Sequence, residues 1–301
     1  KINYEEITKV TPELLEYMEY DHRALYEVIE KYQNWELIRK AGTSFTMAGQ
    51  ALRVFRTFIK SPISGLQPNV DNFVRKGYYG GRTEIFKPLF LPKTKKIKTL
   101  KCADVNSLYP TVMRNNDYPV QVDRVVRDYV EGEMGFYQAT VKVPEDMYVP
   151  PLGTIAEIDG SSKLIFPVGT FDGTWSSVEL DYAKSLGVEI LGIEKGFIFK
   201  NGGPIFKEYI DTLYDMRLRA KEEGDAVTDI LCKLLMNSLY GRFGLSVTKE
   251  CIEFDTFTGR GGAIHSEFMT KRGFARLIKK KKKLSKTFTN VAIASWTTSL
   301  A

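Results

Sequence analysis

The sequence is poor in the residues on which common metal and nucleophile sites depend. Its 301 residues include two histidines, His22 and His265, and three cysteines. The cysteines lie far apart and form no Cys-x-x-Cys pair, which argues against a zinc site or a disulfide framework and predicts a reducing compartment. A metal ion bound here is therefore expected to be a hard cation held by carboxylate oxygens.

Long apolar runs are also lacking. No stretch of 18 apolar residues occurs, so we expect no membrane span and no membrane partner. The first ten residues lack the apolar core of a signal peptide. Because the chain does not begin with Met, we expect a fragment of a longer, intracellular protein. Its 43% hydrophobic and 27% charged residues are ordinary globular values, and the length suggests two or three domains.

Positive charge is concentrated rather than spread evenly. The formal net charge is +6, yet residues 271–286 contain nine Lys or Arg and no acid, so the remainder carries −3. Six further lysines fall within residues 87–101, again without an acid. Basic segments on an otherwise balanced chain indicate a polyanionic partner such as nucleic acid. The alternative interpretations are a solvated lysine loop, a nuclear-localisation signal and a membrane-surface segment.

The first hundred residues indicate helices followed by one strand. Residues 11–33 read as a helix, with Thr11 as its N-cap. A second helix is predicted over about 44–60. Residues 99–105 have the composition of a strand that delivers Asp104 at its carboxyl end.

Beyond residue 115 the pattern changes twice. Residues 116–200 are mostly strand-like, interrupted by a helix that begins at a Ser176–Glu179 capping box and ends at Gly187. Residues 204–241 then predict a helical hairpin with a turn at Gly224 and Asp225. Its second helix shows an apolar stripe of Val227, Ile230, Leu231 and Leu234. An apolar helix is expected from residue 287 onward.

Two segments carry the chemistry. The first is Asp-Val-Asn-Ser-Leu-Tyr-Pro, residues 104–110, and the second is Lys-Leu-Leu-Met-Asn-Ser-Leu-Tyr-Gly, residues 233–241. On a helix, Lys233, Asn237 and Tyr240 share one face. A cation suits a triphosphate, and a flat ring suits a base pair.

The preceding helix adds to this anion site. Arg217 and Lys221 also share a helical face. If the hairpin folds back on itself, these two cations and Lys233 converge on one anion. Asp104 is then well placed to bind Mg²⁺, which usually sits on one or two carboxylates and on substrate phosphates.

These segments resemble family B DNA polymerases. Residues 104–110 match the first palm motif of that family, residues 233–241 match its fingers motif, and Arg217-x-x-x-Lys221 matches the basic pair of the other fingers helix. The resemblance implies that Asp104 and Val105 hold Mg²⁺ or Mn²⁺, with two ions in the complete enzyme, and that Tyr109 is a steric gate against the ribose 2′-hydroxyl. It further implies nucleotide binding by Ser107, Leu108, Tyr109, Arg217, Lys221, Lys233, Asn237 and Tyr240.

Further motifs lie upstream in the order expected for the family. Tyr78-Tyr79-Gly80-Gly81 resembles the segment that links the exonuclease and polymerase domains, and Tyr17-x-x-x-Asp21 resembles the third exonuclease motif. The resemblance implies DNA contacts by Tyr78, Gly80 and Gly81. From the basic run itself we expect Lys279, Lys280 and Lys282 to contact the nucleic-acid backbone.

The detailed form of both main motifs is similar to that of protein-primed members, which include phages, adenoviruses and linear plasmids. This resemblance implies a DNA template and primer, dNTP and a terminal protein as partners, in the cytoplasm of an infected cell or in an organelle. We expect an α+β fold with a right-hand palm: the end of an exonuclease domain and a linker (1–60), the first part of the palm (61–115), a β-rich insertion resembling the first terminal-protein region (116–203), helical-hairpin fingers (204–244), an insertion resembling the second terminal-protein region (245–286), and the palm resumed (287–301).

The chain also departs from the family pattern. It contains no Tyr-x-Asp-Thr-Asp string. The first two exonuclease motifs and the thumb of the family are also missing from this sequence. The leading interpretation is thus a central segment of a template-directed DNA polymerase that uses two metal ions, inactive by itself if later aspartates are required. The alternative is a non-catalytic nucleic-acid-binding module derived from that fold. An RNA-copying polymerase is disfavoured by Tyr109.

Purely structural roles remain open for the same residues. Asp104 would then cap a turn, Lys233 would be a solvated lysine, and Gly80 with Gly81 would form a turn. Tyr109 and Tyr240 would be packing aromatics, and the spacing of Tyr17 and Asp21 would arise by chance.

Overall fold

The computed structural model describes residues 9–86, 101–246, 248–254, 263–270, 273–283 and 289–301. Its chain divides into two compact units. The helical unit comprises Lys1–Pro62, Ser107–Asn116 and Pro204–Leu239, and the sheet unit comprises Ile63–Asn106, Asp117–Gly203 and Tyr240–Ala301. Each unit is therefore assembled from three separate stretches of sequence.

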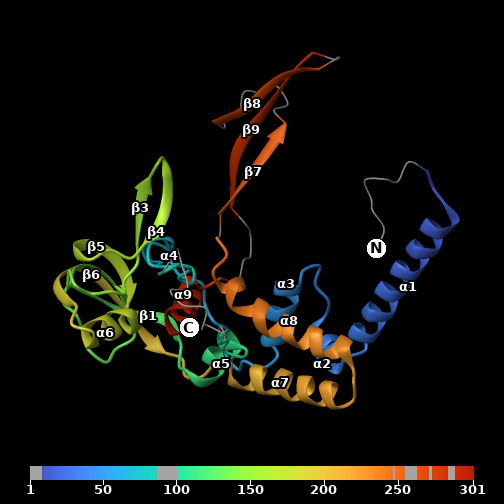
Figure 1. The fold of residues 1–301 in the computed structure, drawn as a ribbon, viewed down its shortest axis with the longest axis horizontal. Coiled ribbons are helices and arrows are strands. Elements are labelled where there is room, and N and C mark those ends of the chain that lie inside the picture. Colours follow the sequence, from blue (N-terminus) through green and yellow to red (C-terminus); the bar gives the residue numbers. More distant parts are fainter. Residues whose placement is uncertain (1–8, 87–100, 247, 255–262, 271–272, 284–288) are drawn as a thin grey trace, which may run out of the picture. The chain divides into compact units, whose positions relative to one another are not determined.

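The helical unit contains six helices within its described residues (Figure 1). The predicted N-terminal helix is confirmed as α1, with the Thr11 hydroxyl accepting a hydrogen bond from the Leu14 N–H at 3.3 Å. The predicted helix over 44–60 is shorter, because Thr46 caps its first turn and bonds between residues three apart tighten the chain after Phe55. The helices are α1 (Pro12–Gln33), α2 (Glu36–Ala41), α3 (Met47–Phe55), α5 (Leu108–Asn115), α7 (Lys207–Glu222) and α8 (Ala226–Phe243), of which the last turn of α8 belongs to the sheet unit.

Helices α7 and α8 form the predicted hairpin. Gly224 lies between them at φ +73°, a left-handed conformation that glycine adopts without steric cost. The Tyr209 hydroxyl of α7 donates to the Leu235 carbonyl of α8 at 2.8 Å inside the core. Phe206 packs its ring 5.0 Å from that of Phe55, which ties α7 to the end of α3.

The buried face of α8 differs from the predicted stripe. Ile230 and Leu234 are 56% and 43% exposed, whereas the buried residues of this helix are Thr228, Leu231, Cys232, Leu235, Met236, Leu239 and Phe243. Apolar residues surround most of this helix, so its sequence does not select one face.

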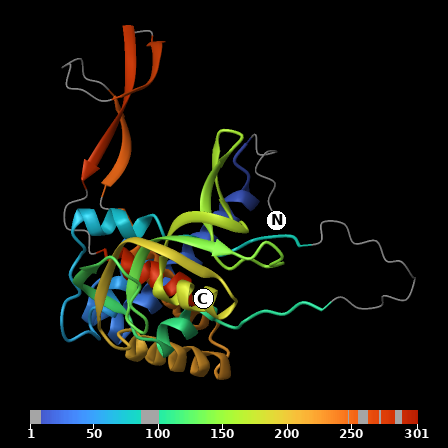
Figure 2. The same cartoon turned by 90° about the vertical axis from the view of Figure 1, so that its left-hand side faces the viewer.

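The sheet unit is built on a four-stranded antiparallel sheet in the order β1-β6-β2-β5. Two smaller sheets are separate from it: the β3–β4 hairpin, drawn as a two-stranded ribbon in Figures 1 and 2, and a three-stranded sheet in the order β7-β9-β8. The strands are β1 (Pro119–Val126), β2 (Gly135–Val143), β3 (Thr154–Ile158), β4 (Ser161–Ile165), β5 (Gly169–Ser176), β6 (Glu189–Asn201), β7 (Thr248–Phe254), β8 (Ala263–Thr270) and β9 (Gly273–Lys283), and the helices are α4 (Pro68–Arg75), α6 (Ser177–Ser185) and α9 (Val291–Leu300).

Both faces of the four-stranded sheet are covered. Strand alternation sends Tyr137 and Trp175 to a cluster that includes Leu180 of α6. The neighbouring Phe136 faces the other way, where its ring lies 5.9 Å from that of Trp296 on α9. Phe73 of α4 packs edge-on against Phe197 on the same face. The β-rich segment predicted over 116–200 thus forms a layered core with its own helices.

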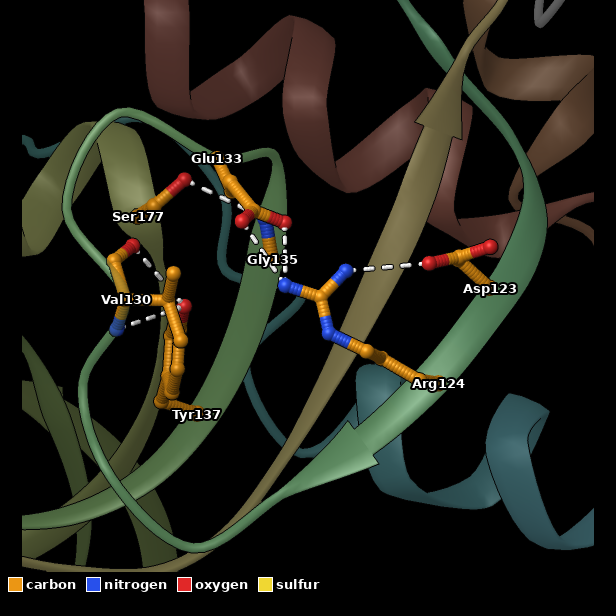
Figure 3. Close-up of polar contacts among 7 residues, drawn as sticks. All are labelled: Asp123, Arg124, Val130, Glu133, Gly135, Tyr137 and Ser177. Atoms are coloured by element: carbon orange, nitrogen blue, oxygen red, sulfur yellow. Dashed lines mark hydrogen bonds and ion pairs between the residues drawn. The ribbon is translucent and has the colours of Figure 1, made fainter.

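Figure 3 shows how the connection between β1 and β2 is held. The Arg124 guanidinium donates from Nη2 to both Glu133 oxygens at 2.7 Å and from Nη1 to Asp123 at 3.0 Å. The Tyr137 hydroxyl donates to the Val130 carbonyl and accepts from the Val130 N–H, both at 3.3 Å. These bonds satisfy polar groups of a loop whose residues Tyr129 and Val130 pack against the core cluster around Tyr137.

Other local predictions have mixed outcomes. The Ser176–Glu179 capping box is present, Gly187 follows α6 at φ +93°, and the C-terminal apolar helix is α9. The strand predicted over 99–105 is wrong for residues 101–105, which have no strand partner among the described residues. A strand needs a neighbour to satisfy its backbone groups, and composition alone does not supply one. None of the described helices is long and apolar enough to cross a membrane.

Candidate functional site

Arg217 on α7 is the centre of the candidate site in the helical unit. Its Nε donates to the Asp229 carboxylate on α8 at 2.5 Å, and its Nη1 donates to the Ser107 hydroxyl at 3.4 Å. The second bond joins residues that are 110 positions apart in the sequence. The α7–α8 hairpin and the start of α5 therefore meet at this guanidinium.

The predicted cations act electrostatically on Asp229. The pKa of its carboxyl group is lowered, first by the hydrogen bond from Arg217 and then by the positive charges of Arg217, Lys221 and Lys233. Arg217 thus contacts a carboxylate of the chain itself, and the convergence of all three cations on one anion stays a prediction. A small anionic group fits such a setting.

Ser107 gives the start of α5 an unusual geometry. It precedes Leu108 in a left-handed conformation, with φ +53° and ψ +45°, and its side chain makes no capping hydrogen bond to the helix. The Ser107 hydroxyl instead meets Arg217. The first N–H groups of a helix lack partners within the helix and carry a partial positive charge. Leu108 and Tyr109, both half-buried, lie in this first turn.

The face of α8 that was predicted to bind nucleotide is accessible. Lys233 and Asn237 are exposed, and Tyr240 is half-buried one turn further on. Within the described part of the chain, Lys233 makes no hydrogen bond or ion pair, and neither does Lys221 on α7. Their ammonium groups therefore remain available to a ligand.

Asp104 and Val105 lie in the sheet unit, and both are exposed. Asp104 has no hydrogen-bond or ion-pair partner among the described residues, so it does not cap a turn there. Its carboxylate and the Val105 carbonyl are oxygen donors of the kind that Mg²⁺ prefers. In the described ranges, however, no group of three acidic, His or Cys side chains is close enough to hold a metal ion.

The segment around Tyr78 packs against the end of the fingers motif. A Cβ atom on Gly244 would lie only 2.7 Å from the Tyr78 ring, and Arg75 donates to the Gly244 and Leu245 carbonyls at 2.7 and 2.8 Å. Gly80 and Gly81 are exposed in an irregular segment and are not assigned to a turn, so the turn interpretation is wrong for them.

The remaining predicted site residues are placed elsewhere. Tyr17 and Asp21 lie one turn apart on α1 and are exposed, as is the rest of that helix for the most part. Lys279, Lys280 and Lys282 lie in β9, the central strand of its sheet, where Lys280 is paired with Cys251 and Lys282 with Lys249. The alternative of a lysine loop is therefore wrong for residues 279–283.

Sequence reasoning missed Asp229. It lies four residues before Lys233, a spacing that places the two side chains on one face of α8. It also lies 12 residues from Arg217, across the hairpin turn. The sequence could have indicated this ion pair, because Asp229 is an acidic residue placed among the predicted cations Arg217, Lys221 and Lys233.

Comparison with known proteins places this chain in a family. The family model described as "DNA polymerase type B, organellar and viral" matches residues 1–270. The chain belongs to that family. The membership inferred from the two motifs is thus confirmed. This type B polymerase chain is mixed α/β, as predicted at the level of fold class.

Its relatives come from fungi and phages. A probable DNA polymerase of Neurospora intermedia is 32% identical over 268 residues, which are 84% of this chain and 26% of the relative. The DNA-directed DNA polymerase of Enterobacteria phage PRD1 is 27% identical over 247 residues, 77% of this chain and 38% of the relative. The type B chain thus spans about a quarter to two fifths of the length of these relatives.

Solved structures show the same fold. Phi29 DNA polymerase complexed with single-stranded DNA superposes with a TM-score of 0.67 and 20% sequence identity, covering 100% of this chain and 50% of the other. The same polymerase complexed with primer-template DNA and incoming nucleotide substrates superposes with a TM-score of 0.66, at 19% identity over 99% of this chain and 51% of the other.

Proposed function

We propose that this chain is the central segment of a template-directed DNA polymerase, containing part of the palm and the fingers. The observation that carries the proposal is the contact of Arg217 on α7 with Asp229 on α8 and with Ser107 at the start of α5. The reaction is transfer of a deoxynucleotidyl group from dNTP to a hydroxyl, with release of pyrophosphate. Membership in a polymerase family favours this activity over a non-catalytic binding module.

In this proposal the nucleotide lies between the hairpin and α5. The three predicted cations bind the triphosphate, together with the first N–H groups of α5 at Leu108 and Tyr109. Asn237 and Tyr240 contact the base pair from α8, since they share a helical face with Lys233. The Tyr109 ring stands against the sugar and excludes a 2′-hydroxyl.

Asp104 and the Val105 carbonyl fit a divalent cation, Mg²⁺ or Mn²⁺. The fit rests on an exposed carboxylate that no described residue neutralises. When bound, such a cation neutralises phosphate charge and stabilises the attacking and leaving oxygens. Binding of two ions requires further carboxylates in addition to Asp104. Asp104 itself would carry the negative charge that attracts the cation.

Other parts of the chain are assigned to macromolecular partners. Tyr78, Gly80, Gly81 and the lysines of β9 contact template and primer DNA. The β-rich segment 116–203 and residues 245–286 contact a terminal protein, whose hydroxyl replaces the primer 3′-hydroxyl at initiation. Tyr17 and Asp21 on α1 end an exonuclease domain. The support for these roles is the order of the motifs along the chain.

The test is made in the full-length polymerase. Asp104→Asn should lower kcat for nucleotide incorporation at least about 100-fold, or about 2.7 kcal/mol of barrier, while DNA affinity changes less than about twofold. Lys233→Ala should raise KM for dNTP about tenfold, because one charge-assisted contact is lost. Incorporation kinetics and filter binding measure both effects.

Asp146→Asn is the matched control, since it removes one exposed carboxylate from the β-rich segment. Its kinetics should equal those of the parent protein. If Asp104→Asn retained more than about a tenth of the parent kcat, Asp104 would not be a metal ligand in the reaction.

A further inference from the structure

The Arg217–Asp229 pair is oriented in a way that matters for ligand binding. Asp229 accepts from Nε, on the inner edge of the guanidinium, while Nη1 reaches the Ser107 hydroxyl. Within the described residues Nη2 donates to no acceptor. A guanidinium has five N–H donors in a rigid fork, so a partner on Nε leaves most of the outer donors for another anion.

Asp229 is itself held firmly. Its backbone N–H donates to the Asp225 carbonyl at 3.1 Å, within the first turn of α8. Its side chain is 27% exposed and that of Arg217 is 14% exposed, so water competes only in part for their ion pair. A carboxylate fixed on α8 therefore limits the rotamers open to an arginine on α7.

Fixing an arginine in this way has an energetic consequence. A long side chain loses rotamer freedom when it binds a ligand, which costs free energy. A side chain that is already held in one rotamer avoids that cost and therefore binds the ligand more tightly. Asp229 also adds a negative charge near the triphosphate, which opposes binding. The two effects change nucleotide affinity in opposite directions, so the sign of the affinity change on removal of Asp229 shows which effect is larger.

We propose that Asp229 is a positioning residue for nucleotide binding: it holds Arg217 by Nε, so that the Nη groups face Ser107 and the triphosphate at the start of α5. The role rests on the proposed function of the same site. Asp229 does not touch the nucleotide and acts only through Arg217. We expect the orienting effect to exceed the repulsion, because Asp229 contacts Arg217 directly.

The experiment compares single and double variants of the full-length polymerase. Asp229→Ala should raise KM for dNTP about 5- to 10-fold and change kcat less than about threefold, since the lost interaction acts on binding. Asp229→Asn keeps the shape and an acceptor oxygen for Nε and should raise KM less. In an Arg217→Ala background, Asp229→Ala should add less than about twofold, because its target is absent.

Glu222→Gln is the control for loss of one negative charge from the same hairpin, since Glu222 is exposed at the end of α7. It should leave KM unchanged. Circular dichroism of each variant shows whether the hairpin folds, and Asp229→Asn remains a test if Asp229→Ala does not fold.

Each contrary outcome has a distinct meaning. A lower KM in Asp229→Ala would show that Asp229 competes with the triphosphate and would overturn the positioning role. Independent, multiplicative effects in the double variant would also overturn it. If Arg217→Ala alone left KM unchanged, the proposed nucleotide site would be wrong, and the role of Asp229 with it.

Discussion

Ser107 is a single residue whose conformation shapes the candidate site. With φ +53° it occupies a region that costs a non-glycine residue roughly 1–2 kcal/mol. A glycine would remove that cost but also the hydroxyl that meets Arg217 at 3.4 Å. Strained backbone persists where surrounding structure over-determines it, and such positions cluster at functional sites. The backbone conformation of Ser107 therefore costs stability, while its hydroxyl links α5 to α7.

Tyr109, two residues further on, is the residue-scale test of sugar selection. Tyr109→Val in the full-length polymerase should permit ribonucleotide incorporation, because a smaller side chain leaves room for a 2′-hydroxyl. We expect the ratio of kcat/KM for dCTP to that for CTP to fall at least about tenfold, which is about 1.4 kcal/mol of discrimination.

Tyr109→Phe keeps the ring and serves as the control. It should preserve the parent ratio, because the gate depends on bulk rather than on the hydroxyl. An unaltered ratio in Tyr109→Val would make Tyr109 a packing residue.

Helix α8 begins with a cap that also binds a distant helix. The Asp225 carboxylate accepts from the Thr228 N–H at 3.1 Å and from the Thr228 hydroxyl at 2.7 Å, and it forms an ion pair with Lys31 of α1. These contacts, the Lys31 bond first, lower the pKa of Asp225 to about 2. The start of the helix that carries Lys233 is therefore stabilised by local capping and by a contact 194 residues away.

The element-scale prediction concerns this cap. Asp225→Ala should lower the free energy of unfolding by about 1 kcal/mol at pH 7, the usual effect of a lost N-cap. Because folding depresses the pKa of Asp225, its contribution is complete above the unfolded value near 4 and is lost as pH falls toward 2. The difference between variant and parent should thus shrink between pH 4 and pH 2. Urea unfolding followed by circular dichroism measures it.

Asp225→Asn separates the two contributions, because asparagine caps helices about as well as aspartate but carries no charge. In Asp225→Asn, the pH-dependent contribution of residue 225 to the free energy of unfolding should be absent. Most of the stability at pH 7 should remain. A pH-independent difference for Asp225→Ala would mean that the ionised carboxylate does not stabilise the fold.

At the scale of the whole molecule, charge is segregated. The strand β9 carries five successive lysines, Lys279–Lys283, and pairs on both sides with β7 and β8. Paired strands order their backbones, so these lysines have defined register positions rather than places on a loop. Lysines act as compact charges on phosphates and do not read bases. The segment is therefore suited to DNA contact without sequence preference.

The corresponding prediction uses salt dependence. Replacing Lys279, Lys280 and Lys282 by Ala in the full-length polymerase should flatten the slope of log K against log[salt] by at most about 3, since each neutralised phosphate contributes about 0.9. Affinity should fall similarly on unrelated duplexes. Fluorescence anisotropy at several salt concentrations gives the slope.

Lys142, Lys163 and Lys200 are exposed lysines outside this sheet, and their triple replacement by Ala is the control for net charge. An unchanged slope in the β9 variant would show that its lysines do not contact phosphates. A loss restricted to one DNA sequence would show base recognition instead.

The sequence by itself determined the features that depend on neighbouring residues. Thr11, the Ser176–Glu179 capping box and the turn at Gly224 were predictable, because a cap or a turn is satisfied by backbone groups a few positions away. The family was predictable for another reason: residues 104–110 and 233–241 resemble two motifs of that family in residue type and spacing.

Only the tertiary structure decided which surfaces meet. The composition of α8 is apolar around the helix, so packing against α7 selected Leu231 and Leu235 over Ile230. Residues 101–105 have strand-like composition but no neighbouring strand among the described residues. The contact of Arg217 with Ser107 spans 110 residues, and no local pattern encodes it. Such pairings depend on the packing of whole elements, whose free energy is shared among many residues rather than written in one motif.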